Sequence, residues 1–180
     1  MTSSASLLPV RLVPYEPDFL RPFIAWRGEP LTVRHNPLKQ MSDSEIETML
    51  LAESADLSQV GKAESFRWFI SVGGEAVGSI SLKNISHSMG HGELGYGMAE
   101  SHHGKGIATA ALRLLIKKIF AESTLRRLLA YVHEENQPSR RVLEKLGFQE
   151  EGLLREHYLI NGVPVNEVLY ALLKREWLNE

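Results

Sequence analysis

The stretch from Glu93 to Phe120, ELGYGMAESHHGKGIATAALRLLIKKIF, constrains the fold more than any other part of the chain. It reads as a strand, a short glycine-containing loop and a long helix that begins at once. Within the helical part Thr109, Arg113 and Lys117 recur every four residues as a narrow polar stripe, and most other positions are apolar. A helix with so wide an apolar surface must be buried against other elements. We therefore expect it to pack on a sheet to which the preceding strand belongs.

The start of this helix is a candidate phosphate site. The first amide N–H groups of a helix have no partner within the helix, and they lie at the positive end of its dipole. Gly104 and Gly106 leave room for a phosphate to reach those amides, Ala108 keeps the next turn small, and Lys105 adds a positive charge. A glycine pair alone also fits a plain strand-to-helix turn. No Gly-Lys-Ser/Thr and no third glycine follow, so the pattern favours a phosphate ligand other than ATP or NAD.

The strands predicted from alternating or apolar runs form mainly hairpins. The dipeptides Gly73-Gly74 and Asn161-Gly162 each separate two such runs and can supply a two-residue turn. The predicted strands are Val10–Tyr15, FRWFISV, AVGSISLKNI, His91–Met98, RLLAYVH, LLREHYLI and EVLYALL. With helices between several of them, the pattern predicts an α/β (α+β) fold with a mixed, mostly antiparallel sheet of about six or seven strands flanked by helices.

Four helices are expected. DFLRPFIAWRG forms a short helix interrupted near Pro22 and closed by Gly28, and MSDSEIETMLLAES forms a second that Ser42 or Ser44 can cap. The long helix runs from about Gly104 to Ala121, and a short one runs from about Pro138 to Leu146.

Length and composition bound the remaining options. A chain of 180 residues with 43% apolar residues fits one domain, residues 1–180, with a single sizeable core. A net charge of −2 gives no global reason to expect a nucleic acid partner. The absence of cysteine excludes disulfides, thiolate zinc sites and a cysteine nucleophile. The N-terminus lacks a basic leader and no run of about twenty apolar residues occurs, so we expect a cytoplasmic protein without a membrane partner.

Three segments together resemble the GCN5-related N-acetyltransferase (GNAT) superfamily. They are ELGYGMAESHHGKGIATAAL, NQPSRRVLEKLGF and EEGLLREHYLINGVPVNEVLYALL, and the similarity spans roughly Arg67 to Trp177. Within the superfamily, the sequence is most similar to the ribosomal-protein N-terminal (alanine or serine) acetyltransferases. The resemblance implies a single GNAT domain with splayed central strands and acetyl-CoA as cosubstrate.

The resemblance also implies which residues hold acetyl-CoA. The family's phosphate motif, Arg/Gln-x-x-Gly-x-Gly/Ala, falls on His103 to Ala108, so that backbone N–H groups there would bind the pyrophosphate. His103 departs from the Arg or Gln of the motif. If its charge mattered, CoA affinity would depend on pH, whereas backbone binding would leave affinity little changed. The implied cofactor-binding residues are Tyr96, Gly97, Met98, His103, Gly104, Lys105, Gly106, Ile107, Ala108, Thr109, Asn136, Ser139 and Arg141.

Acetyl transfer needs a neutral amine, a polarised thioester carbonyl and a proton for the departing thiolate. Glu93 is the candidate base, acting through water, although a carboxylate on a sheet face is also commonly just solvated. Ser139 is the candidate for positioning or protonating the thiolate. Asn136 and Ser139 also fit an ordinary helix cap. A backbone N–H near Tyr96 to Met98 would polarise the carbonyl.

Other candidates remain open at this stage. The weaker alternatives to Ser139 are Tyr131, Tyr158 and Tyr170. The basic side chains Arg113, Lys117, Arg140 and Arg141 could contact the ribose phosphate of CoA or could simply be solvated helix surface. His87, His91, His102 and His103 form no pattern typical of a metal site, and the transfer needs no metal, so we expect none.

The predicted function is therefore acetyl-CoA-dependent N-acetylation by direct transfer in a ternary complex. The expected acceptor is a peptide or protein N-terminal α-amine. Two alternatives stay open: a small-molecule amine acetyltransferase acting on a polyamine, amino acid or antibiotic, and a non-catalytic acyl-CoA-binding module. The acceptor side would be built from Asp18–Gln59 and Leu153–Leu173, where similarity is weakest. The Asp that the family has near the last strand is displaced in this sequence, which has Asn166-Glu167 there. The protein could be a monomer or a homodimer.

Overall fold

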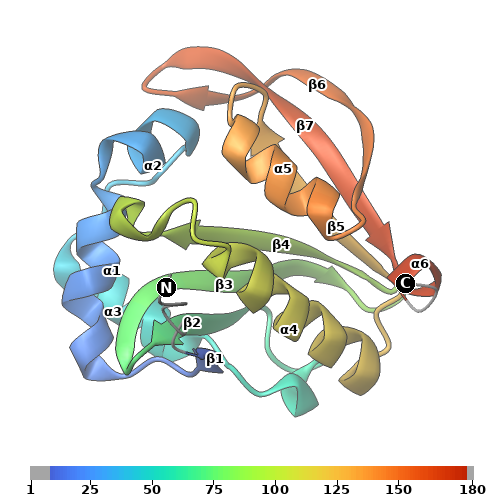
Figure 1. Cartoon of the computed structure of the whole chain (residues 1–180), viewed down its shortest axis with the longest axis horizontal. Coiled ribbons are helices and arrows are strands. Elements are labelled where there is room, and N and C mark those ends of the chain that lie inside the picture. Colours follow the sequence, from blue (N-terminus) through green and yellow to red (C-terminus); the bar gives the residue numbers. More distant parts are fainter. Residues whose placement is uncertain (1–8, 178–180) are drawn as a thin grey trace, which may run out of the picture.

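The computed structural model describes residues 9–177, which form one mixed seven-stranded sheet with helices on both faces (Figure 1). The strand order is β1-β2-β3-β4-β5-β7-β6. The strands are β1 (Val10–Val13), β2 (Phe66–Val72), β3 (Glu75–Ser86), β4 (His91–Met98), β5 (Arg127–His133), β6 (Gln149–Ile160) and β7 (Val163–Leu173). The expected mixed, mostly antiparallel sheet is confirmed. Residues 1–8 and 178–180 of the expected domain lie outside the described residues.

The sheet splays at its centre, between β4 and β5. These two strands form the one parallel pair of the sheet, and they pair only from His91–Arg127 to Glu93–Leu129. Beyond Glu93 the two strands separate, so the rest of β4 has a neighbouring strand on one side only. This is the splayed pair that the family resemblance implied.

The main helices are α1 (Leu20–Arg27), α2 (Pro30–His35), α3 (Asp43–Ala52), α4 (Ile107–Glu122), α5 (Gln137–Lys145) and α6 (Lys174–Trp177). Three single-turn 3₁₀ segments, η1 (Pro17–Phe19), η2 (Leu57–Gln59) and η3 (Glu100–His102), lie between them. No helix among residues 9–177 is long and apolar enough to cross a membrane.

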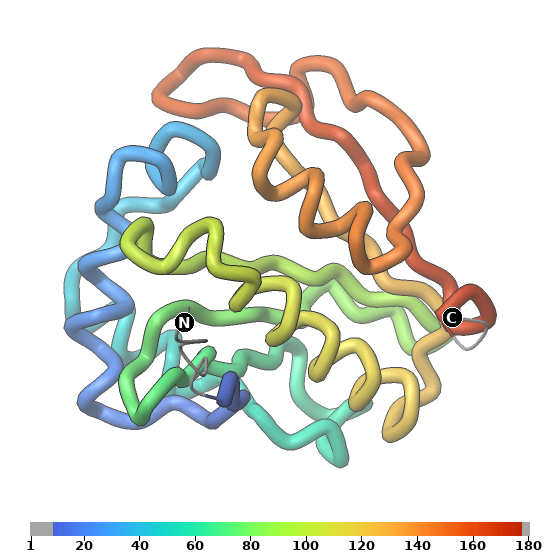
Figure 2. The backbone as a smooth tube through the Cα atoms, viewed as in Figure 1, coloured from blue at the N-terminus to red at the C-terminus, as the bar shows by residue number. Residues whose placement is uncertain are grey.

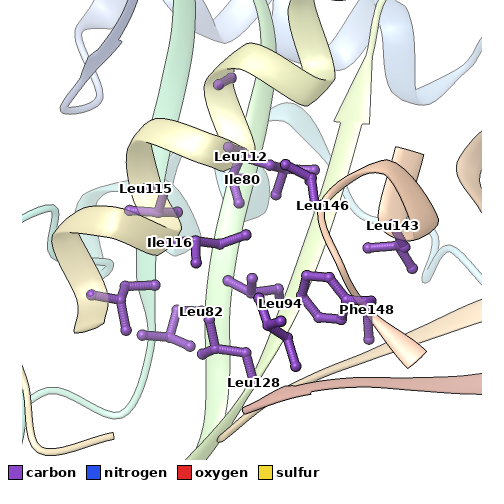
Figure 3. Close-up of a cluster of buried hydrophobic side chains, with 14 of the residues drawn as sticks. Ile80, Leu82, Leu94, Leu112, Leu115, Ile116, Leu128, Leu143, Leu146 and Phe148 are labelled. Atoms are coloured by element: carbon purple, nitrogen blue, oxygen red, sulfur yellow. The ribbon is translucent and has the colours of Figure 1, made fainter. Parts of the chain in front are cut away.

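The larger core lies between one face of the sheet and helices α4 and α5. Figure 3 shows Leu112, Leu115 and Ile116 of α4 against side chains of the central strands, with Leu143 of α5 beside them. All four of these side chains are essentially fully buried. This packing holds both helices on the same face of the sheet, with α4 alongside β3 and β4 and α5 alongside β5, as the backbone trace also shows (Figure 2).

A smaller aromatic core lies on the opposite face, under α1 and α3. Phe69 of β2 is fully buried there and lies within 5.2 to 6.3 Å, centroid to centroid, of the rings of Phe19, Phe23 and Trp26. α3 begins with a capping box, in which Ser42 accepts from the Glu45 N–H and Glu45 accepts from the Ser42 N–H. Of the two expected caps, Ser42 is therefore the one that is used.

Three local expectations need correction. Pro22 does not interrupt α1, because it falls in the first turn, where its missing N–H would have no acceptor within the helix. The long helix begins at Ile107 rather than Gly104, with Gly106 as its N-cap. The short helix α2, which begins at Pro30, was not among the predicted helices.

Candidate active site

A cleft of about 360 Å³ opens beside the splayed strands. Four elements border it: the end of β4, the start of α4, α5 and α2 (Figure 1). Predicted residues line most of it: Tyr96, Gly97, Met98, His103, Gly104, Gly106, Ile107, Ala108, Thr109, Asn136, Ser139 and Arg141. Predicted residues as far apart in sequence as Tyr96 and Arg141 thus line one cleft. Lys105 and Glu93 are the two predicted residues that do not line it.

The start of α4 forms one end of the cleft and has the properties of an anion site. Gly104 and Gly106 have φ angles of +73° and +74°, which glycine adopts without strain. A Cβ added at either position would meet no atom within 4 Å, so the space above the loop is open. The helix begins with the Ala110 N–H donating to the Gly106 carbonyl, which leaves the N–H groups of the preceding residues without helical acceptors.

His103 lines the cleft but is tied to the protein backbone. Its Nε2 lies 3.0 Å from the Met98 carbonyl oxygen, and because a carbonyl can only accept, Nε2 is the donor. The ring thus joins the phosphate loop to the end of β4. This contact gives His103 a structural role, which agrees with the view that the backbone carries anion binding here.

Two amide N–H groups at the end of β4 point into the splay. The β3–β4 register is unbroken along this part of β4, and the Ala99 N–H donates to β3 at its end. Because hydrogen-bonding direction alternates along an antiparallel strand, the N–H groups of Tyr96 and Met98 face the β5 side. β5 pairs with β4 only over His91–Glu93, so these two groups have no strand partner. Of the stretch from Tyr96 to Met98, in which a carbonyl-polarising donor is predicted, these two residues are therefore the ones whose N–H groups point into the splay.

Ser139 lies at the start of α5 and bonds to a buried tyrosine of β4. The Tyr96 hydroxyl is 2.7 Å from Ser139 Oγ and 3.0 Å from the Ser139 carbonyl oxygen. Burial raises the pKa of Tyr96 to about 12, so it is a neutral phenol at neutral pH. Asn136 caps α5, with its Oδ1 accepting from the Ser139 N–H at 3.2 Å. The Tyr96 hydroxyl is a functional group that the sequence analysis did not single out.

Glu93 stands apart from this cluster. Its side chain is 15% exposed, and its two carboxylate oxygens bond to Lys83 Nζ at 3.1 Å and Asn84 Nδ2 at 2.7 Å. It shares the sheet face of Gly95 and Gly97, as strand parity predicted, because the β3–β4 irregularity lies on the far side of the Lys83–Glu93 pair. The structure therefore confirms its direction but does not bring it to Ser139.

The other candidates are mostly committed to structural contacts. Arg140 donates to Tyr170 Oη at 3.0 Å and to Glu150, and Tyr170 in turn donates to Glu144, so this tyrosine hydroxyl is occupied away from the cleft. Arg113 lies over the Trp177 ring. Of the four basic candidates, Arg141 is the one that lines the cleft. Among residues 9–177 there is no cluster of three or more His, Asp or Glu side chains placed to hold a metal ion.

α2 supplies cleft residues that sequence reasoning missed, namely Leu31, Thr32 and His35, with Asn36 following them. Two glutamates fix this helix to the phosphate loop. Glu100 Oε1 accepts from the Leu31 N–H at 2.8 Å, and Glu29 Oε2 accepts from the Glu100 N–H at 2.7 Å. Pro30 after Glu29 was the available sequence signal, since proline favours the first turn of a helix.

The chain matches the family model described as an acetyltransferase (GNAT) domain over residues 10–149. The matched segment contains every cleft element described above. It ends before the β6–β7 hairpin is complete.

Individual relatives agree with this match. The chain is 43% identical over 107 residues to a putative ribosomal N-acetyltransferase, YdaF, of Bacillus subtilis, which covers 59% of this chain and 58% of the relative. It is 30% identical over 114 residues to the spermidine N(1)-acetyltransferase of Escherichia coli K12, covering 63% of this chain and 61% of the relative. The aligned segments thus span about three fifths of these relatives.

A solved structure extends the similarity to nearly the whole fold. Mycobacterium smegmatis RimJ in complex with CoA-disulfide superimposes with a TM-score of 0.76 at 28% identity, covering 93% of this chain and 83% of that one.

Proposed function

This chain belongs to the GNAT acetyltransferase family, and on that premise we propose that it transfers the acetyl group of acetyl-CoA to the α-amine of a peptide or protein N-terminus. The observation that carries the proposal is the cleft itself. At one end of the cleft the glycine-rich start of α4 is suited to bind a pyrophosphate. At the other end, two backbone N–H groups without a strand partner point into the splay and are suited to bind a thioester carbonyl.

Each end of the cleft has its own task. The N–H groups at the start of α4 would bind the pyrophosphate of acetyl-CoA, with Arg141 at the rim. The N–H groups of Tyr96 and Met98 would donate to the acetyl oxygen as negative charge develops on it during attack by the amine. The C–N bond forms, the C–S bond breaks, and the CoA thiolate leaves.

The departing thiolate needs one proton, and Ser139 is placed to direct it. If the Tyr96 hydroxyl donates to Ser139 Oγ, the Ser139 proton is free to point to the sulfur. Tyr96 and Ser139 then act as one proton-donating pair. Glu93 remains the base predicted from sequence, and its ion pair with Lys83 means that water would have to link it to the amine.

The acceptor would enter between α2 and the β6–β7 hairpin. The exposed apolar side chains there are Leu31, Val33, Leu153, Leu159 and Val163. They suit a peptide, which can bury apolar side chains and bond through its backbone. YdaF is named as a putative ribosomal N-acetyltransferase, which is consistent with a protein acceptor.

A polyamine is the second candidate, since a relative is named as a spermidine acetyltransferase. Two carboxylates, Glu93 and Glu167, lie on the acceptor face of the sheet and would attract a polycation. In Tyr131 the charges of both carboxylates add to the effect of burial in raising the tyrosine pKa.

The proposal is tested by thiol release from acetyl-CoA with three acceptors: peptides with free N-terminal alanine or serine, the same peptides N-acetylated beforehand, and spermidine. We expect the kcat/KM of the free peptides to exceed that of spermidine by about tenfold or more, because the enzyme would contact several residues of a peptide acceptor. The blocked peptides should be inert, because they have no free α-amine. A preference for spermidine would favour the second candidate. Thiol release with none of the three would contradict both.

A further inference from the structure

A wide bulge in β6 presents a histidine to the acceptor face. The β6–β7 register shifts between Leu154 and Tyr158, so residues 155–157 loop out of the ladder. Glu156 has a φ of +48°, and Asn166 Oδ1 accepts from its N–H at 2.8 Å. Asn166 also donates to Glu134 Oε1 at 3.1 Å. Bulges commonly re-aim a side chain next to an active site, and this one is held by a dedicated side-chain contact.

The side chain that the bulge re-aims is His157. Its Nδ1 lies 2.6 Å from Glu167 Oε2 on β7, and its ring stacks on Tyr131 of β5 with centroids 5.6 Å apart. Glu167 is the one charged residue among residues 9–177 that is classed as buried, at 9% exposure, whereas the His157 side chain is 46% exposed. Since a carboxylate can only accept, Nδ1 carries a proton and the unshared electron pair of a neutral ring lies on Nε2.

Strand registers place this pair on the sheet face opposite α4. Tyr131 and His133 alternate with the buried residues of β5, so they face away from α4, and Glu167 lies opposite His133. Continuing the β4–β5 register from Glu93–Leu129 puts Tyr131 across the splay from Gly95. The glycine has no side chain to fill the gap. By this register the His157 ring, stacked on Tyr131, lies beside the splay on the sheet face that points away from α4.

We propose that His157 is the general base of the transfer and that Glu167 positions it. This rests on the proposed function. His157 Nε2 takes one proton from the acceptor ammonium, and the neutral amine attacks the thioester carbon. The C–N bond forms while the C–S bond breaks. Ser139 gives its proton to the CoA thiolate and takes up the second amine proton in its place, and His157 returns its proton to solvent. The carboxylate holds the ring in one tautomer and stabilises the imidazolium formed in the step.

His157 is better placed than Glu93 to accept the proton of the ammonium group. Both oxygens of Glu93 are bonded to Lys83 and Asn84, whereas no hydrogen bond to His157 Nε2 exists within the described part of the chain. Several charged or titratable groups surround His157. On the strands they are Glu167 of β7, Tyr131 and His133 of β5, Arg155, Glu156 and Tyr158 of β6, and Glu93 of β4. On α2 the group is His35, whose carbonyl oxygen accepts from the Tyr158 hydroxyl.

The test is the pH profile of kcat/KM for the best acceptor, in the wild type and in His157→Gln. A histidine base gives an ascending acid limb, and its removal should lower kcat/KM near neutrality by about 100-fold or more and shift that limb to higher pH. Free imidazole should restore activity to His157→Ala in proportion to its concentration. Glu167→Gln should lose on the order of tenfold, with Glu167→Asp recovering part of it, because a glutamine oxygen can still accept from Nδ1 but carries no negative charge to stabilise the imidazolium.

His87→Gln is the matched control, since His87 is an exposed histidine in the β3–β4 turn. It should retain the wild-type profile. Calorimetric titration with CoA should show unchanged affinity in all variants, which separates a lost base from a lost fold. Wild-type-like rates and an unshifted acid limb in His157→Gln would overturn the inference while leaving the proposed function intact. A wild type that acetylates no amine would instead refute the proposed function.

Discussion

The hydroxyl of Tyr96 has a single proton and two neighbours that can accept it. If the phenol donates to the Ser139 carbonyl, Ser139 Oγ must donate back to the phenol; if it donates to Oγ, the serine proton is free. Burial keeps the phenol neutral by raising its pKa to about 12, so this choice persists across the physiological range. In the proposed transfer, proton delivery to the thiolate would thus be a property of the pair rather than of Ser139 alone.

Replacing Tyr96 with Phe should make the free energy of unfolding fall less steeply as the pH rises above 10. A tyrosine pKa raised in the folded state contributes stability that is present below pH 10 and is lost as the pH rises through about 12, since the unfolded chain ionises first. Two pKa units correspond to about 2 to 3 kcal/mol. Denaturant unfolding at pH 8, 10 and 11.5 should show a steeper loss in the wild type than in Tyr96→Phe. Parallel losses in both proteins would contradict this assignment.

Single residues could be predicted from sequence where their neighbours are local. Asn136 caps the helix that it precedes, and the cap needs no knowledge of the fold. The partner of Ser139 is 43 residues away on another element, and the partner of Glu93 is a lysine on the adjacent strand. Such contacts depend on strand order and register, which local patterns do not specify.

At the scale of elements, α2 lines the cleft and is bonded to the segment just before the glycine-rich loop. The helix has six residues, none of them buried, so packing alone cannot fix it. Glu100 caps its first turn from the segment just before the phosphate loop, and Glu29 returns a bond to that segment. The sequence did not predict this helix because six residues with no apolar stripe give no helical period.

Glu100→Ala should therefore loosen α2 without unfolding the protein. Loss of one helix-capping contact should lower the free energy of unfolding by about 1 kcal/mol. We expect the KM of the acceptor to rise several-fold while kcat changes less, because Leu31, Thr32 and His35 line the cleft from α2. Steady-state kinetics and denaturant unfolding measure both effects, with the exposed Glu64→Ala as control. An unchanged acceptor KM would show that α2 does not shape the acceptor site.

For the molecule as a whole, the decisive feature is that a continuous sheet opens at its centre. The outer pairs β1–β2, β2–β3 and β6–β7 are antiparallel, and the two hairpins among them could be predicted from their glycine turns. The splay could not be derived from local pattern, because β4 and β5 are joined by the long helix α4 and pair over only three residues. It was anticipated from family resemblance alone. The larger core contains side chains from strands on both sides of the splay, whereas the smaller aromatic core packs on the opposite face, against β2.

The central claim is that backbone amides at the glycine-rich start of α4 hold CoA, and ligand-induced stabilisation tests it most directly. A ligand present at about 100 times its dissociation constant raises the free energy of unfolding by about 2.7 kcal/mol. The readout is the CoA-induced rise in the thermal midpoint, because Gly106→Val also strains a residue with φ of +74° in the free protein. We predict that His103→Ala keeps most of the wild-type rise and that Gly106→Val loses it. Loss in His103→Ala with retention in Gly106→Val would contradict the account.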